Sequence, residues 1–101
     1  MKLVQIFLPL YDNEGRRFPL ALYARERERL VERFGGLTAH MRSPAHGLWW
    51  DGSRTKRDDI AILEVMVRRL DRKWWTEYRH RLQKRFKQKE LLMRVQHIEV
   101  L

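Results

Sequence analysis

The 101-residue sequence contains no cysteine, three prolines and five glycines. Without cysteine, neither a disulfide nor a thiolate nucleophile is available, and the absence suits a reducing compartment. The longest uncharged stretch near the start, residues 3–11, is too short to span a bilayer and is not followed by a small-residue cleavage pattern. We therefore expect a cytoplasmic protein with no membrane partner.

Familiar catalytic and cofactor motifs are missing as well. The sequence has no glycine-rich phosphate loop, no G-x-S-x-G elbow and no H-E-x-x-H pattern, and no two of its four histidines are spaced i,i+4. We expect no metal and no cofactor. The length allows one modest core, so residues 1–101 are expected to form a single domain.

Positive charge is the most abundant polar feature. The formal net charge is +9, and residues 68–90 contain ten cations against three anions. A basic segment of this kind attracts polyanions, although a solvated helix face that keeps the protein soluble has the same composition.

Hydrophobic periodicity predicts four strands and two helices. Strands are expected over residues 2–10, 37–42, 59–67 and 91–100, where apolar residues alternate or run continuously. The second is expected to be interrupted at residues 43–47 and to resume at 48–50, with a polar loop over 51–58.

The two helices are marked by their ends. The first should begin near Pro19 and stop at Gly35-Gly36. The second should begin at Asp71, a good N-cap residue. The apolar stripe predicted for the first helix comprises Leu20, Tyr23, Ala24, Leu30, Val31 and Phe34. Residues 25–29 and 32–33, which alternate in charge, are assigned to its solvent face.

The resulting order, β-α-β-β-α-β, predicts an α+β fold of the ferredoxin-like type: a four-stranded antiparallel sheet with both helices on one face. Strand parity then leaves the other face largely apolar around Gln5, Glu64 and Arg94, with His40 as a further candidate. A face this apolar is expected to be covered by a second copy of the chain, which predicts a homodimer.

Glu64 lies within the apolar strand of residues 60–67. If it is poorly solvated, its pKa rises into the range of a general acid or base, with His40 as its partner. The structural alternative is that Glu64 pairs with Arg94 or accepts a hydrogen bond from Gln5.

The string Phe34-Gly35-Gly36-Leu37-Thr38, followed by Gly47-Leu48-Trp49, resembles small uncharacterised bacterial proteins of the ferredoxin-like, dimeric α+β barrel type. The resemblance implies a fold and a dimer rather than a reaction, because that group includes enzymes as well as proteins without known activity.

Two functional hypotheses follow. In the first, a small-molecule ligand binds in a cleft on the open face, with Gln5 and Arg94 as binding residues and Trp49 and Trp50 lining its edge. In the second, the basic second helix binds nucleic acid without sequence preference, through phosphate contacts from Lys73, Lys84 and Lys87. Whether the protein is an enzyme stays open.

Overall fold

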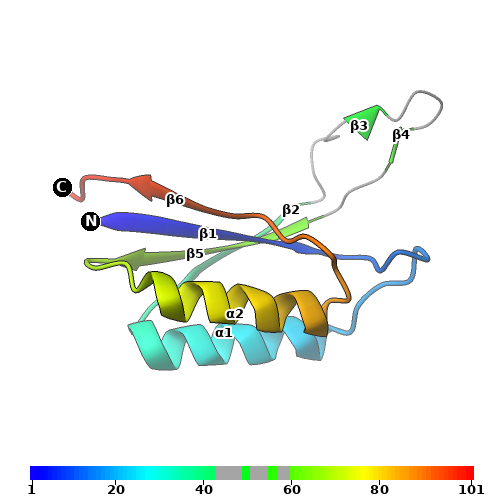
Figure 1. Cartoon of the computed structure of the whole chain (residues 1–101), viewed down its shortest axis with the longest axis horizontal. Coiled ribbons are helices and arrows are strands. Elements are labelled where there is room, and N and C mark those ends of the chain that lie inside the picture. The colour runs from blue at the N-terminus through cyan, green and yellow to red at the C-terminus, as the bar shows by residue number, and fades with distance from the viewer. Residues whose placement is uncertain (43–48, 51–54, 57–59) are drawn as a thin grey trace.

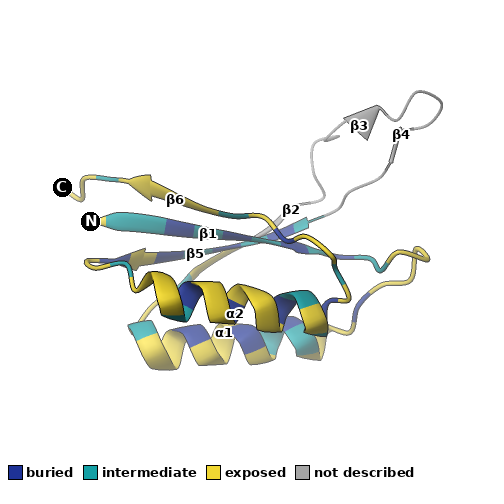
Figure 2. Cartoon of the chain, viewed as in Figure 1, coloured by how far each residue is buried: buried dark blue, intermediate teal, exposed yellow. Residues whose placement is uncertain are grey.

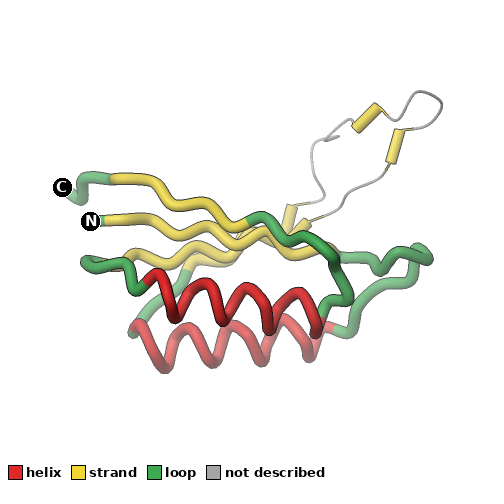
Figure 3. Tube along the Cα trace, viewed as in Figure 1, coloured by secondary structure: helices red, strands yellow, loops and turns green. Residues whose placement is uncertain are grey.

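A computed structural model of the chain describes residues 1–42, 49–50, 55–56 and 60–101, with the backbone alone considered for residues 40–42, 49–50 and 55–56. Two layers are visible, one of strands and one of helices (Figure 3). The elements follow in the order β1 (Lys2–Pro9), α1 (Leu20–Phe34), β2 (Thr38–Arg42), β3 (Trp49–Trp50), β4 (Thr55–Lys56), β5 (Ile60–Val67), α2 (Arg72–Arg85) and β6 (Met93–His97).

The main sheet has four antiparallel strands in the order β2-β5-β1-β6. The two longest strands, β1 and β5, are central. Their side chains alternate between buried and half-buried along most of their length, because one face meets the helices and the other does not.

Both helices pack on the same face of this sheet (Figure 1). The core between the two layers is made by the inward residues of β1 and β5 and by buried apolar residues of both helices, where the buried positions in Figure 2 gather. Its completely enclosed members include Val4, Ile6, Leu8, Leu30, Leu82 and Phe86. The α+β architecture predicted from the element order is thereby confirmed, and its arrangement is compatible with the ferredoxin-like fold.

The helix boundaries also agree with the sequence signals. Asp71 caps α2, where its Oδ1 accepts a hydrogen bond from the Trp74 backbone N–H at 3.1 Å. At the end of α1, Gly35 adopts the left-handed conformation with φ of 79°, and its N–H donates to the Val31 carbonyl at 2.7 Å. These contacts satisfy backbone groups that the ends of a helix leave unpaired.

The predicted stripe of α1 is partly wrong. Leu20 and Val31 are 65% and 46% exposed, whereas Glu26, assigned to the solvent face, is only 1% exposed. The reason is a tertiary contact: Arg85 of α2 supplies a cationic partner for the Glu26 carboxylate, which allows this position to face the neighbouring helix. Periodicity on one helix carries no information about that partner.

The segment between β2 and β5 differs from the expectation of a resumed second strand. Trp49–Trp50 is extended, but it pairs with Thr55–Lys56 in a separate two-stranded sheet, so part of the predicted polar loop is strand. The interruption predicted at residues 43–47 lies outside the described residues.

Candidate ligand-binding face

A row of four polar residues crosses the sheet on the face opposite the helices. The strand register places Thr38 opposite Glu64, Glu64 opposite Gln5, and Gln5 opposite Arg94. Directly opposed residues of neighbouring strands share a face and lie within side-chain reach. We term Thr38, Glu64, Gln5 and Arg94 the polar row. Gln5, Glu64 and Arg94 therefore share one face, as strand parity predicts.

The centre of the polar row is hydrogen-bonded. Gln5 Nε2 donates to Glu64 Oε2 at 2.8 Å, and Gln96 Nε2 approaches Gln5 Oε1 at 3.4 Å. Both Gln5 and Glu64 are half-buried. The contact with Gln5 is one of the two structural roles considered for Glu64 from the sequence, and it fixes the direction in which the carboxylate points.

Arg94, at the edge of the row, has a different contact. Its guanidinium carbon lies 4.7 Å from the centroid of the Phe7 ring, within the distance of a cation–π interaction. Arg94 remains exposed while Phe7 is half-buried. The charged group is therefore held above the sheet, where an anionic group of a ligand can reach it.

Apolar residues flank the polar row on both sides. Leu3, Phe7 and Ile62 are half-buried, and Met66 is 55% exposed. The register pairs Leu3 with Met66 and Phe7 with Ile62, so each side of the row has an apolar cross-strand pair. No described helix covers this surface, which we term the open face.

Three residues assigned to the site from the sequence have side chains outside the described residues: His40, Trp49 and Trp50. By backbone register, His40 is opposite Ile62. Along the same face, this pair is the next one after Thr38 and Glu64. Trp49 and Trp50 belong to the separate two-stranded sheet.

The basic surface predicted on α2 is present. Lys73, Lys84 and Lys87 are exposed, as are the other cations of residues 68–90 apart from Arg85. Arg85 is half-buried and pairs with Glu26, so it is not available to a polyanion in the way that its neighbours are.

A hollow of about 130 Å³ lies between β6 and α2, on the helix side of the sheet, and was not predicted from the sequence. Arg72, Thr76 and Arg79 line it from α2, and Val95 lines it from β6. Val95 pairs with the inward Val4 and faces the helix side, but it is 43% exposed because it borders this hollow. The one sequence signal for this hollow was the spacing of Arg72, Thr76 and Arg79, which places the three residues on one face of the helix.

Within the part of the chain that the structure describes, no helix is long and apolar enough to cross a membrane. The same residues contain no cluster of three or more His, Asp or Glu side chains arranged to hold a metal ion.

The fold and the open face define a small α+β protein with an exposed sheet surface. No family model and no curated protein matches the chain. Among solved structures it is similar to a phage SAM lyase in complex with S-methyl-5'-thioadenosine, with 13% identity and a TM-score of 0.55 over 94% of this chain and 79% of that one. The apo state of a phage SAM lyase gives 14% identity and a TM-score of 0.53, over 94% of this chain and 78% of that one. At such identities the likeness shows the fold alone.

Proposed function

We propose that the chain binds a small organic ligand on the open face of its sheet. The observation that supports this most directly is the polar row, a hydrogen-bonded carboxylate and amide beside a guanidinium, which crosses an otherwise apolar surface that no described helix covers. A few polar groups converging within an apolar surrounding are the usual composition of a small-molecule site.

The charges suggest which ligands fit. Glu64 accepts hydrogen bonds from amine or hydroxyl groups, whereas Arg94 pairs with carboxylate or phosphate. Phe7 and Ile62 offer apolar contact beside them. The structural neighbour, a phage SAM lyase, binds S-methyl-5'-thioadenosine. A nucleoside thioether, with hydroxyl groups at one end and an apolar methylthio group at the other, is therefore the first class to test.

A second copy of the chain is proposed to close the site. The open face has half-buried Leu3, Phe7 and Ile62 and exposed Met66, an apolar surface that favours packing against another sheet. Two such sheets face to face form a homodimer with the two polar rows between them, as in a dimeric α+β barrel. Trp49 and Trp50 are proposed to line the edge of the resulting cleft.

If the bound ligand reacts, Glu64 is the proposed general acid or base, with His40 as its partner. The register places the two residues on neighbouring strands, one residue pair apart. Gln5 then orients the Glu64 carboxylate through the 2.8 Å hydrogen bond. This role requires the ligand to place a transferable proton within hydrogen-bond reach of Glu64.

Calorimetric titration with S-methyl-5'-thioadenosine and with SAM tests the proposal. We expect Glu64→Gln to weaken the binding of both ligands about tenfold, the loss of one charge-assisted hydrogen bond. Arg94→Gln should weaken the binding of SAM, which has a carboxylate, by a similar factor and should affect S-methyl-5'-thioadenosine, which has no anionic group, less. Glu77→Gln and Arg69→Gln, which remove exposed charges elsewhere, serve as controls and should leave binding unchanged.

Equal affinities in all four variants would exclude the polar row as the binding site. Light scattering at micromolar concentration tests the dimer separately. A monomeric parent chain contradicts the proposed second copy, and a dimer that persists after Met66→Lys contradicts an interface on the open face.

The exposure of Lys73, Lys84 and Lys87 supports a second candidate function, sequence-independent binding of nucleic acid along α2. Anisotropy of short fluorescent DNA and RNA across a range of salt concentrations tests it. Each phosphate contact contributes about 0.9 to the slope of log K against log salt on duplex DNA. Neutralising the three lysines should therefore lower that slope by about 3. No binding at physiological salt would leave α2 as a solubility feature.

A further inference from the structure

The outer edge of β6 offers unpaired backbone groups. Phe7 N–H donates to the Leu92 carbonyl and Ile98 N–H donates to the Met1 carbonyl, both at 3.0 Å. Backbone groups alternate in direction along an antiparallel strand, so Met93, Val95 and His97 point theirs away from β1. Because β6 is the last strand of the sheet, these groups have no backbone partner among the described residues.

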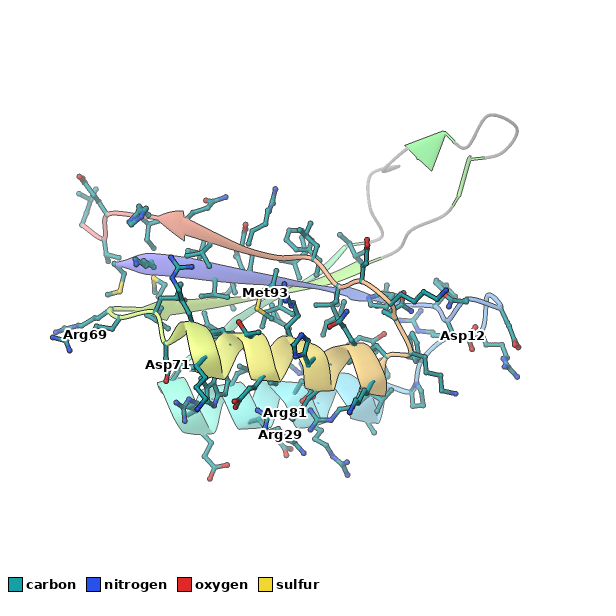
Figure 4. The ribbon with its side chains drawn as sticks, in the orientation of Figure 1. Asp12, Arg29, Arg69, Asp71, Arg81 and Met93 are labelled. Atoms are coloured by element: carbon teal, nitrogen blue, oxygen red, sulfur yellow. The ribbon has the colours of Figure 1, made fainter. Side chains whose placement is uncertain are left out.

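The hollow between β6 and α2 adjoins this edge. Met93 and Val95, whose backbone groups are unpaired, line the hollow with their side chains. Val4 and Trp75 complete its apolar floor. Figure 4 shows Met93 between β6 and α2. At about 130 Å³ the hollow is smaller than the ~300–1,000 Å³ pockets that enclose whole small molecules, and it suits one apolar side chain.

The rim of the hollow on α2 is cationic. Arg72 and Arg79 are exposed and two turns apart, about 10.5 Å along the helix axis, with Thr76 between them. Neither guanidinium forms a salt bridge with any residue that the structure describes, and none of the residues lining the hollow is acidic. The rim therefore complements a negatively charged partner.

We propose that the β6 edge binds an extended acidic peptide segment of another protein, which adds a strand beside β6. One apolar side chain of the peptide enters the hollow, and acidic residues two positions before and after it meet Arg72 and Arg79. In a strand, those positions lie on the same face as the apolar residue, about 13–14 Å apart, a span that two arginine side chains cover. Main-chain hydrogen bonds provide affinity, and alternate side chains provide selectivity.

A second copy of this chain is a poorer occupant of the edge. Antiparallel pairing of two β6 strands brings the Arg72 and Arg79 of both copies to the same interface, in a chain whose formal net charge is +9. Like charges placed opposite each other disfavour such a contact. This surface is on the helix side of the sheet, so it is independent of the ligand proposed for the open face.

Fluorescence anisotropy with a labelled peptide containing Glu-Thr-Val-Thr-Glu, at physiological ionic strength, tests the proposal. The double variant Arg72→Gln/Arg79→Gln is expected to bind about tenfold more weakly, as two partly exposed ion pairs are lost. The control Arg69→Gln/Lys89→Gln removes equal charge at exposed positions outside the hollow and should bind like the parent; Arg69 points away at one end of the molecule (Figure 4). Circular dichroism confirms that both variants fold.

Backbone methylation separates strand addition from adsorption of an anion. Methylating the peptide nitrogens that face β6 should abolish binding, whereas methylating the alternate nitrogens should not. Equal binding by both methylated peptides, no detectable binding of the parent peptide, or full affinity in the Arg72/Arg79 variant overturns the proposal. So does an RNA oligonucleotide that binds the same site more tightly than the peptide, because that result assigns the arginines to nucleic acid.

Discussion

Arg85 forms a salt bridge with Glu26 between the two helices. Its Nη1 donates to Oε1 at 2.6 Å and to Oε2 at 2.7 Å. The two partners are buried to different degrees: the Glu26 side chain is 1% exposed and that of Arg85 is 25% exposed. Removal of either partner therefore leaves the other in a different environment.

Substitution of this pair should destabilise the fold asymmetrically. Arg85→Met leaves an almost fully buried carboxylate without its cation and is expected to lower the free energy of unfolding by about 3 kcal/mol. Glu26→Leu leaves an arginine that is already partly exposed and can turn toward water, so it should cost about 1 kcal/mol. The double variant should be more stable than Arg85→Met alone. Urea denaturation measures all three, and equal losses from the two single changes would contradict this account.

Tyr23 should make stability sensitive to alkaline pH. Its hydroxyl donates to the Pro9 carbonyl at 2.5 Å, and burial raises the pKa of Tyr23 to about 12 against a partial opposing effect of Arg17. The pKa of Tyr23 in the folded protein is above its unfolded value near 10. The contribution of the neutral Tyr23 hydroxyl to folding stability is therefore complete below pH 10 and is lost as pH rises through about 12. Tyr23→Phe should cost about 1 kcal/mol at neutral pH and flatten this decline. Unfolding midpoints between pH 8 and about 12 provide the check, and identical pH profiles for the two proteins would refute it.

Loss of the α2 cap should reduce stability without changing the sheet. Asp71→Ala removes the acceptor for the Trp74 N–H and is expected to cost about 1 kcal/mol in chemical denaturation. Asp71→Asn keeps an acceptor oxygen and should be close to neutral. Glu77→Ala, an exposed acid of the same helix, should change stability by less than about 0.5 kcal/mol. A loss in Glu77→Ala as large as in Asp71→Ala would point to helix charge rather than to capping.

The two consecutive glycines after α1 should respond differently to alanine. Gly35 has φ of 79°, and a Cβ there would contact nothing within 4 Å, so Gly35→Ala is expected to cost about 1–2 kcal/mol through backbone strain alone. Gly36 is free of both the positive φ and any close neighbour, so Gly36→Ala should be near neutral or slightly stabilising. Thermal unfolding of the two variants distinguishes them. Similar losses in both would mean that the glycine pair has a role beyond ending the helix.

Much of the fold follows from local patterns. Apolar alternation predicted the strand of residues 2–10, whose Val4, Ile6 and Leu8 are buried, and the capping signals at Asp71 and Gly35 marked helix ends. Strand parity also brought Gln5, Glu64 and Arg94 to one face, because a period of two fixes the face of each residue once one neighbour is known.

Other features depend on segments that are distant in the chain. Glu26 is buried only because Arg85, 59 residues later, arrives beside it, and no pattern within α1 predicts that. The contact of Arg94 with Phe7 and the hollow between β6 and α2 likewise require the packed sheet. The sequence by itself determined the order of the two helices and the four strands of the main sheet, the ends of the helices and the two faces of each central strand, since these arise from spacing and backbone preference. Only the tertiary structure decided which charges are paired, which edge is free and where a cavity remains, because these depend on distances between residues far apart along the chain.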